Sequence, residues 1–171
     1  MEKVERIKRS QFAEFLDITP STATKTYSRI GKGVTTGSLA YNPTVNDEHY
    51  IDEDSGTKLL DGYAPVLGHE QTAYKGNPVF DYVDGLRKKR AIGDDAKTTL
   101  LMVYIYDKQS EGVYAAEEQD VIISINEFGG DAGNPVSITF DINFSGDPRV
   151  GTATITDGKI TFTKQTEQEV E

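Results

Sequence analysis

The longest apolar run in the chain extends from Thr98 to Asp107 and contains neither glycine nor proline. Its aromatic and β-branched residues predict a β-strand. Successive side chains of a strand point to opposite faces, and both faces of this strand are apolar. We expect one face to lie on the core of the chain, and the other to be covered by a helix, a second sheet or a neighbouring subunit. The first face carries Leu100, Met102, Tyr104 and Tyr106, and the second carries Leu101, Val103 and Ile105.

Further strands are predicted on both sides of this run. The clearest alternation of apolar and polar residues is in 136–144, which is typical of a strand with one face on the core. Asp157-Gly158 lies between two short apolar segments, 150–156 and 159–163, and indicates a two-residue β-hairpin turn. Less regular strand patterns occupy residues 24–41, 63–73 and 119–128.

Residues 42–62 form a long polar and acidic loop between two predicted strands. Connections of this length are usually functional or mobile. Short β-like stretches at 49–51 and 58–60 indicate that the loop is itself a hairpin. Its acidic cluster at 52–54 has the oxygen ligands that calcium prefers, but the spacing does not follow the EF-hand pattern, and we assign no metal site to it.

One helix is predicted over residues 77–92. Asn77 is a good N-cap, and Pro78 suits the first helical position. The basic residues 87–90 lie in the last turn, where cations interact favourably with the helix dipole, and Gly93 can end the helix in the left-handed conformation. An apolar stripe on this helix is suited to cover one face of the long apolar strand. The stripe consists of Val79, Val83, Leu86 and the stem of Arg90, with Phe80 beside it.

The first 23 residues are basic and then amphipathic, and we expect them to form an arm that docks on another surface. The spacing of Phe12, Phe15 and Leu16 suits one turn of helix. The whole pattern predicts a mainly β fold with one flanking α-helix, built as two packed antiparallel sheets in a β-sandwich or open barrel. The predicted parts are an arm at 1–23, a β-sandwich domain at 24–163 and an acidic tail at 164–171.

Composition narrows the classes of function. The 171 residues carry a formal net charge of −10, which suits solubility and disfavours binding to nucleic acid, because such binding depends on lysine and arginine. No apolar run approaches the roughly 20 residues of a membrane helix, and the N-terminus lacks the apolar segment of a signal peptide. The absence of cysteine excludes disulfides and thiolate metal sites. We expect a soluble protein made inside a cell.

Candidate chemistry is sparse. Gly31-Lys32-Gly33 superficially resembles a phosphate-binding loop, but it lacks the Walker ending and no helix pattern follows it. His69 beside Glu70 has no cysteine and no nucleophile-elbow serine to act with. We therefore predict no catalytic, cofactor-binding or metal-binding residues, and no enzymatic activity.

Several short motifs, in this order, resemble the major tail proteins, or tail tube proteins, of long-tailed non-contractile bacteriophages. Each motif alone is a turn or a cap, and the resemblance comes from their order over nearly the whole chain. They are Ile7-Lys8-Arg9-Ser10-Gln11-Phe12, Tyr27-x-x-Ile30-Gly31-Lys32-Gly33, Tyr41-Asn42-Pro43, the segment 74–87 at the helix entry, Phe128-Gly129-Gly130 and Ile142-Asn143-Phe144-Ser145-Gly146-Asp147-Pro148.

This resemblance implies a structural virion protein that self-assembles into hexameric rings stacked into a hollow tube. DNA would pass through the lumen without specific binding, and the partners would be further copies and other tail proteins, namely the tape measure, terminator and distal tail proteins. The location would be the phage tail, after synthesis in the host bacterial cytoplasm, with no membrane involved. The N-terminal arm and the long loop would contact other subunits. The candidate contact residues are Phe12, Phe15, Leu16, Tyr50, Asp52, Glu53, Asp54 and Leu59.

Two other readings remain open. A related tail terminator, baseplate or adaptor ring protein would form rings that do not stack. A ligand-binding β-sandwich, such as a carbohydrate-binding module, would usually present exposed aromatic residues on one face. The chain has no tryptophan, and its nine tyrosines are scattered.

Overall fold

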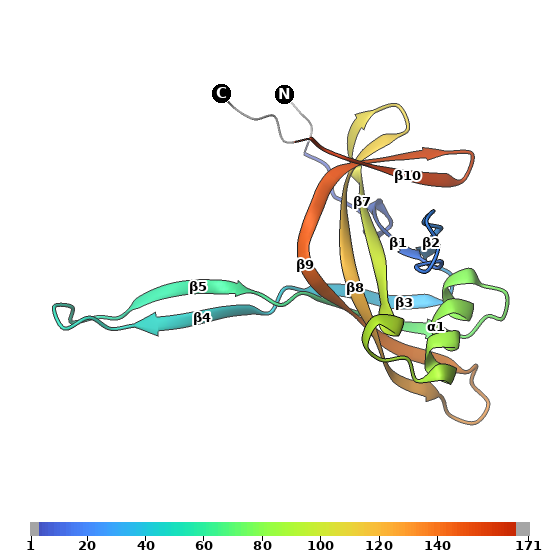
Figure 1. Ribbon diagram of the computed structural model, residues 1–171, viewed down its shortest axis with the longest axis horizontal. Coiled ribbons are helices and arrows are strands. Elements are labelled where there is room, and N and C mark those ends of the chain that lie inside the picture. The colour runs from blue at the N-terminus through green and yellow to red at the C-terminus, as the bar shows by residue number, and fades with distance from the viewer. Residues whose placement is uncertain (1–3, 167–171) are drawn as a thin grey trace.

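The computed structural model describes residues 4–166, which form ten strands and one α-helix (Figure 1). The strands are β1 (Phe12–Asp17), β2 (Tyr27–Ile30), β3 (Val34–Ala40), β4 (Pro43–Glu48), β5 (Thr57–Tyr63), β6 (Val66–Thr72), β7 (Lys97–Ser110), β8 (Val113–Gly129), β9 (Ser137–Thr156) and β10 (Lys159–Lys164). The helix is α1 (Pro78–Lys89), and two short 3₁₀ turns are η1 (Arg9–Gln11) and η2 (Gly93–Ala96).

Eight strands form one antiparallel sheet, and the other two form a separate hairpin. The large sheet has the order β2-β1-β7-β8-β9-β6-β3, with β10 paired to the far half of β9. It curls so that β1 comes close to β3 and β6 at the seam between the edges. The small sheet, β4 and β5, projects away from the curled sheet (Figure 1). The predicted class, mainly β with two antiparallel sheets and one flanking helix, is confirmed.

The main hydrophobic core lies inside the curl and contains one face of β7. Leu100 and Met102 of β7 pack there with the apolar stripe of α1, as the sequence predicted. The inward residues of β9 alternate with polar ones, also as predicted. The buried members of this core include Leu16, Leu67, Val79, Val83, Val121, Ile123, Ile138, Phe140 and Ile142.

A second, smaller core buries the other face of β7. Leu101 and Val103 are completely buried there. Strand β9 is one continuous strand of 20 residues that curves strongly (Figure 1), and its far half carries β10 back over this face. The chain itself therefore covers both faces of β7 from Thr98 to Val103, and no neighbouring subunit is required there.

The N-terminal segment differs from its prediction. Residues 12–17 are not helical but form β1, an interior strand paired with β7 on one side and with β2 on the other. Phe12 and Leu16 face the main core, while Ala13 and Phe15 face the second core. Because a buried glutamate, Glu14, interrupts the apolar pattern, the alternation of a two-faced strand resembled helical spacing.

The helix begins as predicted and ends three residues early. The Asn77 side chain accepts a hydrogen bond from the backbone N–H of Phe80 at 3.0 Å, and Pro78 is the first helical residue. The chain leaves the helix at Arg90, which adopts the left-handed conformation with φ 49°, so Gly93 is not the cap. Arg90 is exposed and does not belong to the buried stripe.

The remaining turns adopt the backbone conformations that their residues favour. Asp157 and Gly158 both have positive φ, as the predicted two-residue hairpin requires. Residues 31–33 form a tight turn between β2 and β3, with Gly33 at φ 82°. The predicted acidic tail begins at the end of β10, and its residues 167–171 lie outside the part of the chain that the structure describes.

We expect Leu100→Ala and Leu101→Ala each to destabilise the isolated subunit by about 2–5 kcal/mol, because both side chains are completely buried, on opposite faces of β7. Urea unfolding of the monomer measures both effects. Val45→Ala, at a half-exposed position on the hairpin of β4 and β5, serves as the control, with a change within about 0.5 kcal/mol. Unchanged stability for Leu101→Ala would mean that the second face is not closed in the monomer.

Candidate functional site

The most exposed element of the described chain is the hairpin of β4 and β5, which we call the projecting hairpin, residues 43–63. Every residue of β4 is exposed, and in β5 only Gly62 is partly covered. The hairpin extends from the base at Tyr41 and Ala64 and points away from the barrel on the side opposite α1 (Figure 1). The prediction that the long acidic loop is itself a hairpin is confirmed, although residues 49–51 lie in its tip and not in a strand.

The two faces of the projecting hairpin differ in character. Val45 pairs with Leu60, and Pro43 pairs with Tyr63, so these four side chains share one face. Val45 and Leu60 are each 51% exposed, and the Tyr63 ring meets the Tyr41 ring edge-on at a centroid distance of 6.0 Å. One face of the projecting hairpin is therefore an apolar strip open to solvent.

The opposite face and the tip are mainly polar and acidic, although the exposed Leu59, which pairs with Asn46, also lies on this face. Asn46 donates a hydrogen bond to Asp61 across the strands, and Tyr50 donates one to Glu48 near the tip. Residues 43–63 contain six carboxylates and one lysine, a net charge of −5, which is half of the formal charge of the chain. Ile51, at the tip, is fully exposed in the midst of these acids.

A free-standing hairpin with such a surface is suited to binding another protein. A two-stranded hairpin is marginally stable in water by itself, and its outer edges present unpaired backbone groups that can pair with another strand. Exposed apolar patches of this kind mark interaction sites. The projecting hairpin is therefore the candidate interaction surface of the molecule.

The predicted contact residues fall into two groups. Tyr50, Leu59 and the acids Asp52, Glu53 and Asp54 all lie exposed on the projecting hairpin.

The other three contact candidates lie in β1. Phe12 and Phe15 are half-buried there, so part of each ring remains accessible. Leu16 is completely buried in the chain's own main core, which removes it from the set of candidate contacts.

The structure adds apolar residues that the sequence reasoning missed. They are Val45, Leu60 and Tyr63 of the apolar strip, Tyr41 at the base of the hairpin and Ile51 at its tip. The signal was present as Pro43 and Val45 at alternate positions in one strand. It was hidden in the other strand, because a β-bulge between Thr44 and Val45 shifts the register and breaks the alternation of residues 57–63.

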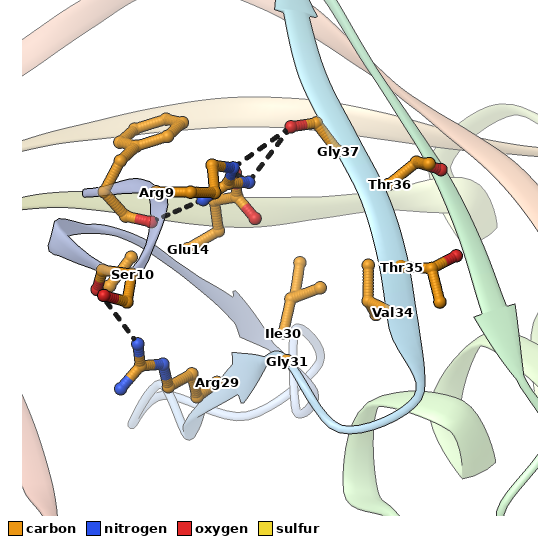
Figure 2. Close-up of a pocket in the computed structure, with 12 residues that line it drawn as sticks. Arg9, Ser10, Glu14, Arg29, Ile30, Gly31, Val34, Thr35, Thr36 and Gly37 are labelled. Atoms are coloured by element: carbon orange, nitrogen blue, oxygen red, sulfur yellow. Dashed lines mark hydrogen bonds and ion pairs between the residues drawn. The ribbon is translucent and has the colours of Figure 1, made fainter.

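A second distinctive region is the seam where the edges of the large sheet approach each other. Figure 2 shows the Arg9 side chain of η1 reaching across this seam to the backbone of β3. Its Nη2 lies 2.6 Å from Glu14 Oε1 and donates to the carbonyl oxygen of Gly37 at 3.1 Å. Its Nη1 donates to the carbonyl oxygen of Phe12 at 2.7 Å. A cavity of about 320 Å³ lies beside Arg9 in the seam.

His69 belongs to this seam and not to a catalytic pair with Glu70. Its ring is completely buried, stacks on Phe140 at 5.3 Å, and places Nε2 3.3 Å from Glu14 Oε2. Glu70 is exposed on the opposite face of β6. Arg9 and Glu14 on one side of the seam therefore contact Gly37 of β3 and His69 of β6 on the other side. No backbone pairing between described residues joins the two sides there.

A third polar cluster ties the bend of β9 to its neighbours. Glu118 of β8 accepts from Arg149 Nε at 2.8 Å, from Lys25 at 3.0 Å and from the Tyr27 hydroxyl. Burial alone would raise the pKa of Glu118, but its three donors outweigh this effect and hold that pKa below its ordinary value. Arg149 also holds Asp120 at 2.8 Å. The Glu118 carboxylate therefore accepts from three donors and forms the centre of an ion-pair network.

Within residues 4–166, no three side chains of histidine, aspartate or glutamate are grouped so that they could share a metal ion. No helix of the described chain is long and apolar enough to cross a membrane.

Comparison with known proteins gives a fold but no sequence family. No protein family matches this sequence, and no curated protein is similar to it. Several solved structures share the fold, and two of them are of gene transfer agent particles. One is described as the tail of an empty gene transfer agent particle with helical refinement and C6 symmetry, with a TM-score of 0.62 and 11% identity, and the match covers 85% of this chain and 98% of that one. The other, described as the virion of a native gene transfer agent particle, has a TM-score of 0.59 and 10% identity over the same shares.

We expect Gly37→Val to destabilise the fold by about 1–3 kcal/mol by forcing the seam apart. A Cβ at this position would lie 3.1 Å from Arg9 Nη2 and 3.2 Å from the His69 ring, so a branched side chain has no room. Urea unfolding measures the effect. Gly85→Ala in α1, where an added Cβ meets nothing within 4 Å, is the control and should stabilise by about 0.5–1 kcal/mol. Equal behaviour of the two variants would contradict a tight seam.

Proposed function

We propose that this protein is the structural subunit of a virion tail tube. Copies assemble into hexameric rings, and the rings stack into a hollow tube through which DNA leaves the particle. The observation that carries the proposal is a fold shared over 85% of the chain with a structure described as a particle tail of C6 symmetry, combined with a free-standing hairpin suited to protein contacts. The ordered sequence motifs of tail tube proteins support the same assignment.

The structure changes how such an assembly would be built. Because the chain covers both faces of β7 itself, the subunit folds before it assembles and does not need its neighbours to complete its core. The contacts between copies then come from the projecting hairpin and from the accessible parts of Phe12 and Phe15. Identical subunits joined head to tail around a closed axis form a ring, and continued stacking extends the ring into a tube.

The charge of the subunit fits a conduit for DNA. Retention of a polyanion requires lysine and arginine against its phosphates, and this chain carries 28 acidic residues against 18 basic ones. In this proposal the tape measure, terminator and distal tail proteins bind the tube ends and lumen, the protein resides in the virion, and it is made in the cytoplasm of the host bacterium.

Electron microscopy of the purified protein at high concentration, alone and with a tail initiator complex, tests the proposal. We expect rings with sixfold symmetry that stack into tubes. Rings that never stack would favour a terminator or baseplate ring protein, and a particle that stays monomeric under both conditions would overturn the assignment.

We further expect deletion of residues 52–56 at the hairpin tip to leave the fold intact and to impair tube formation. The segment is exposed and lies outside both cores, so the monomer should keep its urea midpoint. Tube yield by sedimentation and microscopy reports assembly. Normal tubes from the deletion variant would show that the tip makes no contact needed for assembly.

A further inference from the structure

The molecule carries unlike surfaces on opposite sides. The projecting hairpin, with its net charge of −5, lies on one side of the barrel, and α1 lies on the other (Figure 1). The last turn of α1 and its cap hold four successive basic residues, Arg87 to Arg90. An acidic projection on one side and a basic helix end on the other make the two sides electrostatically complementary between copies.

A large groove lies beside this helix end. Its volume is about 1060 Å³, and its walls are the β1–β2 loop, the end of α1, the start of β7 and the middle of β8. Pockets for small molecules usually have about 300–1,000 Å³, so this groove is large enough for a short peptide segment. Its accessible apolar lining is the half-buried Tyr82 and Ile92, which is 81% exposed, whereas Leu86 and Val121 beside them belong to the buried main core.

On the helix side of the groove, the charged side chains that are not held in ion pairs are positive. Arg87 and Lys88 are both held by Asp84, at 2.8 Å and 2.7 Å, respectively. Lys89 and Arg90 line the groove, are exposed, and form no ion pair within residues 4–166.

Two of the four acids that line the groove are held in ion pairs, and a third, Asp17, is buried and accepts hydrogen bonds from the backbone N–H groups of Thr19 and Thr26. Asp94 pairs with Lys97 at 2.6 Å, and Asp120 pairs with Arg149 at 2.8 Å. Asp95 is exposed at the edge without an ion pair in the described chain, and it opposes part of the positive charge.

We propose that this groove receives the hairpin tip of a second copy of the chain. Lys89 and Arg90 face the acids Asp52, Glu53 and Asp54 of the incoming tip, and the exposed Ile51 packs against the apolar lining beside Ile92. The inference rests on the proposed function, because it names the receiving surface for the contact that the hairpin makes in the assembly. Tip and groove lie on different surfaces of one molecule, so the contact is head to tail and propagates from copy to copy.

Charge exchange tests the electrostatic part in the full-length protein. The tip variant D52K/E53K/D54K and the groove variant K89E/R90E should each raise the critical concentration for assembly by about tenfold or more. The combined variant should return to within about threefold of wild type, because the two reversed surfaces are again complementary. Asp95→Lys alone should lower the critical concentration, because it removes an exposed acid that has no ion pair in the described chain.

The matched control is K159E/K164E, which makes the same charge change at exposed positions of β10, outside the groove. It should leave the critical concentration unchanged. If the groove and control variants behave alike, or if the combined variant is no better than either parent, the groove is not the receiver. If the wild-type protein still forms tubes in the same experiments, failure of the groove proposal does not contradict the proposed function.

Disulfide trapping tests the geometry without requiring tubes, and the chain has no native cysteine to interfere. Copies carrying Ile51→Cys and copies carrying Ile92→Cys, mixed and mildly oxidised, should cross-link faster than Ile51→Cys copies mixed with copies carrying Val150→Cys. Val150 is 50% exposed and does not line the groove. Equal cross-linking rates for the two mixtures would overturn the proposed seating.

Discussion

The burial of both faces of β7 is the constraint on which the rest of the structure depends. Leu100 and Leu101, adjacent in sequence, point in opposite directions and are both completely buried. A flat sheet with one helix covers only one of these faces. Both faces are covered because the large sheet curls around one core, while the long β9 curves and carries β10 over the other.

The closed body contrasts with the hairpin that leaves it. The seam of the curled sheet is joined by side chains, where Arg9 and His69 meet the buried Glu14, and this leaves the body with its cores shielded. The projecting hairpin has no such cover, since nearly all of its residues are exposed. In the proposed assembly, the closed body would keep its fold while the uncovered projection contacts another copy of the chain.

The sequence predicts which residues are exposed where charged residues are concentrated. It does not do so where a few apolar residues are scattered through a polar segment. The acidic tip around Asp52 was identified because charged residues are rarely buried. The open strip of Val45 and Leu60 was missed because single apolar residues in a polar loop look alike whether they face solvent or a core. The prediction of Leu16 as a contact is wrong for the complementary reason: its burial depends on pairing with β7, more than 80 residues away in sequence, which its own neighbours do not reveal.

The sequence by itself determined the elements that depend on short-range chemistry: the strand pattern of β7, the cap of α1, the Asp157-Gly158 turn and the mainly β class. Only the tertiary structure decided what covers the second face of β7 and which side chains close the seam. Local propensity acts over a few residues, whereas covers and seams depend on how far a sheet twists and curls. That curvature is a sum over many strands, and it is settled only when all of them pack at once.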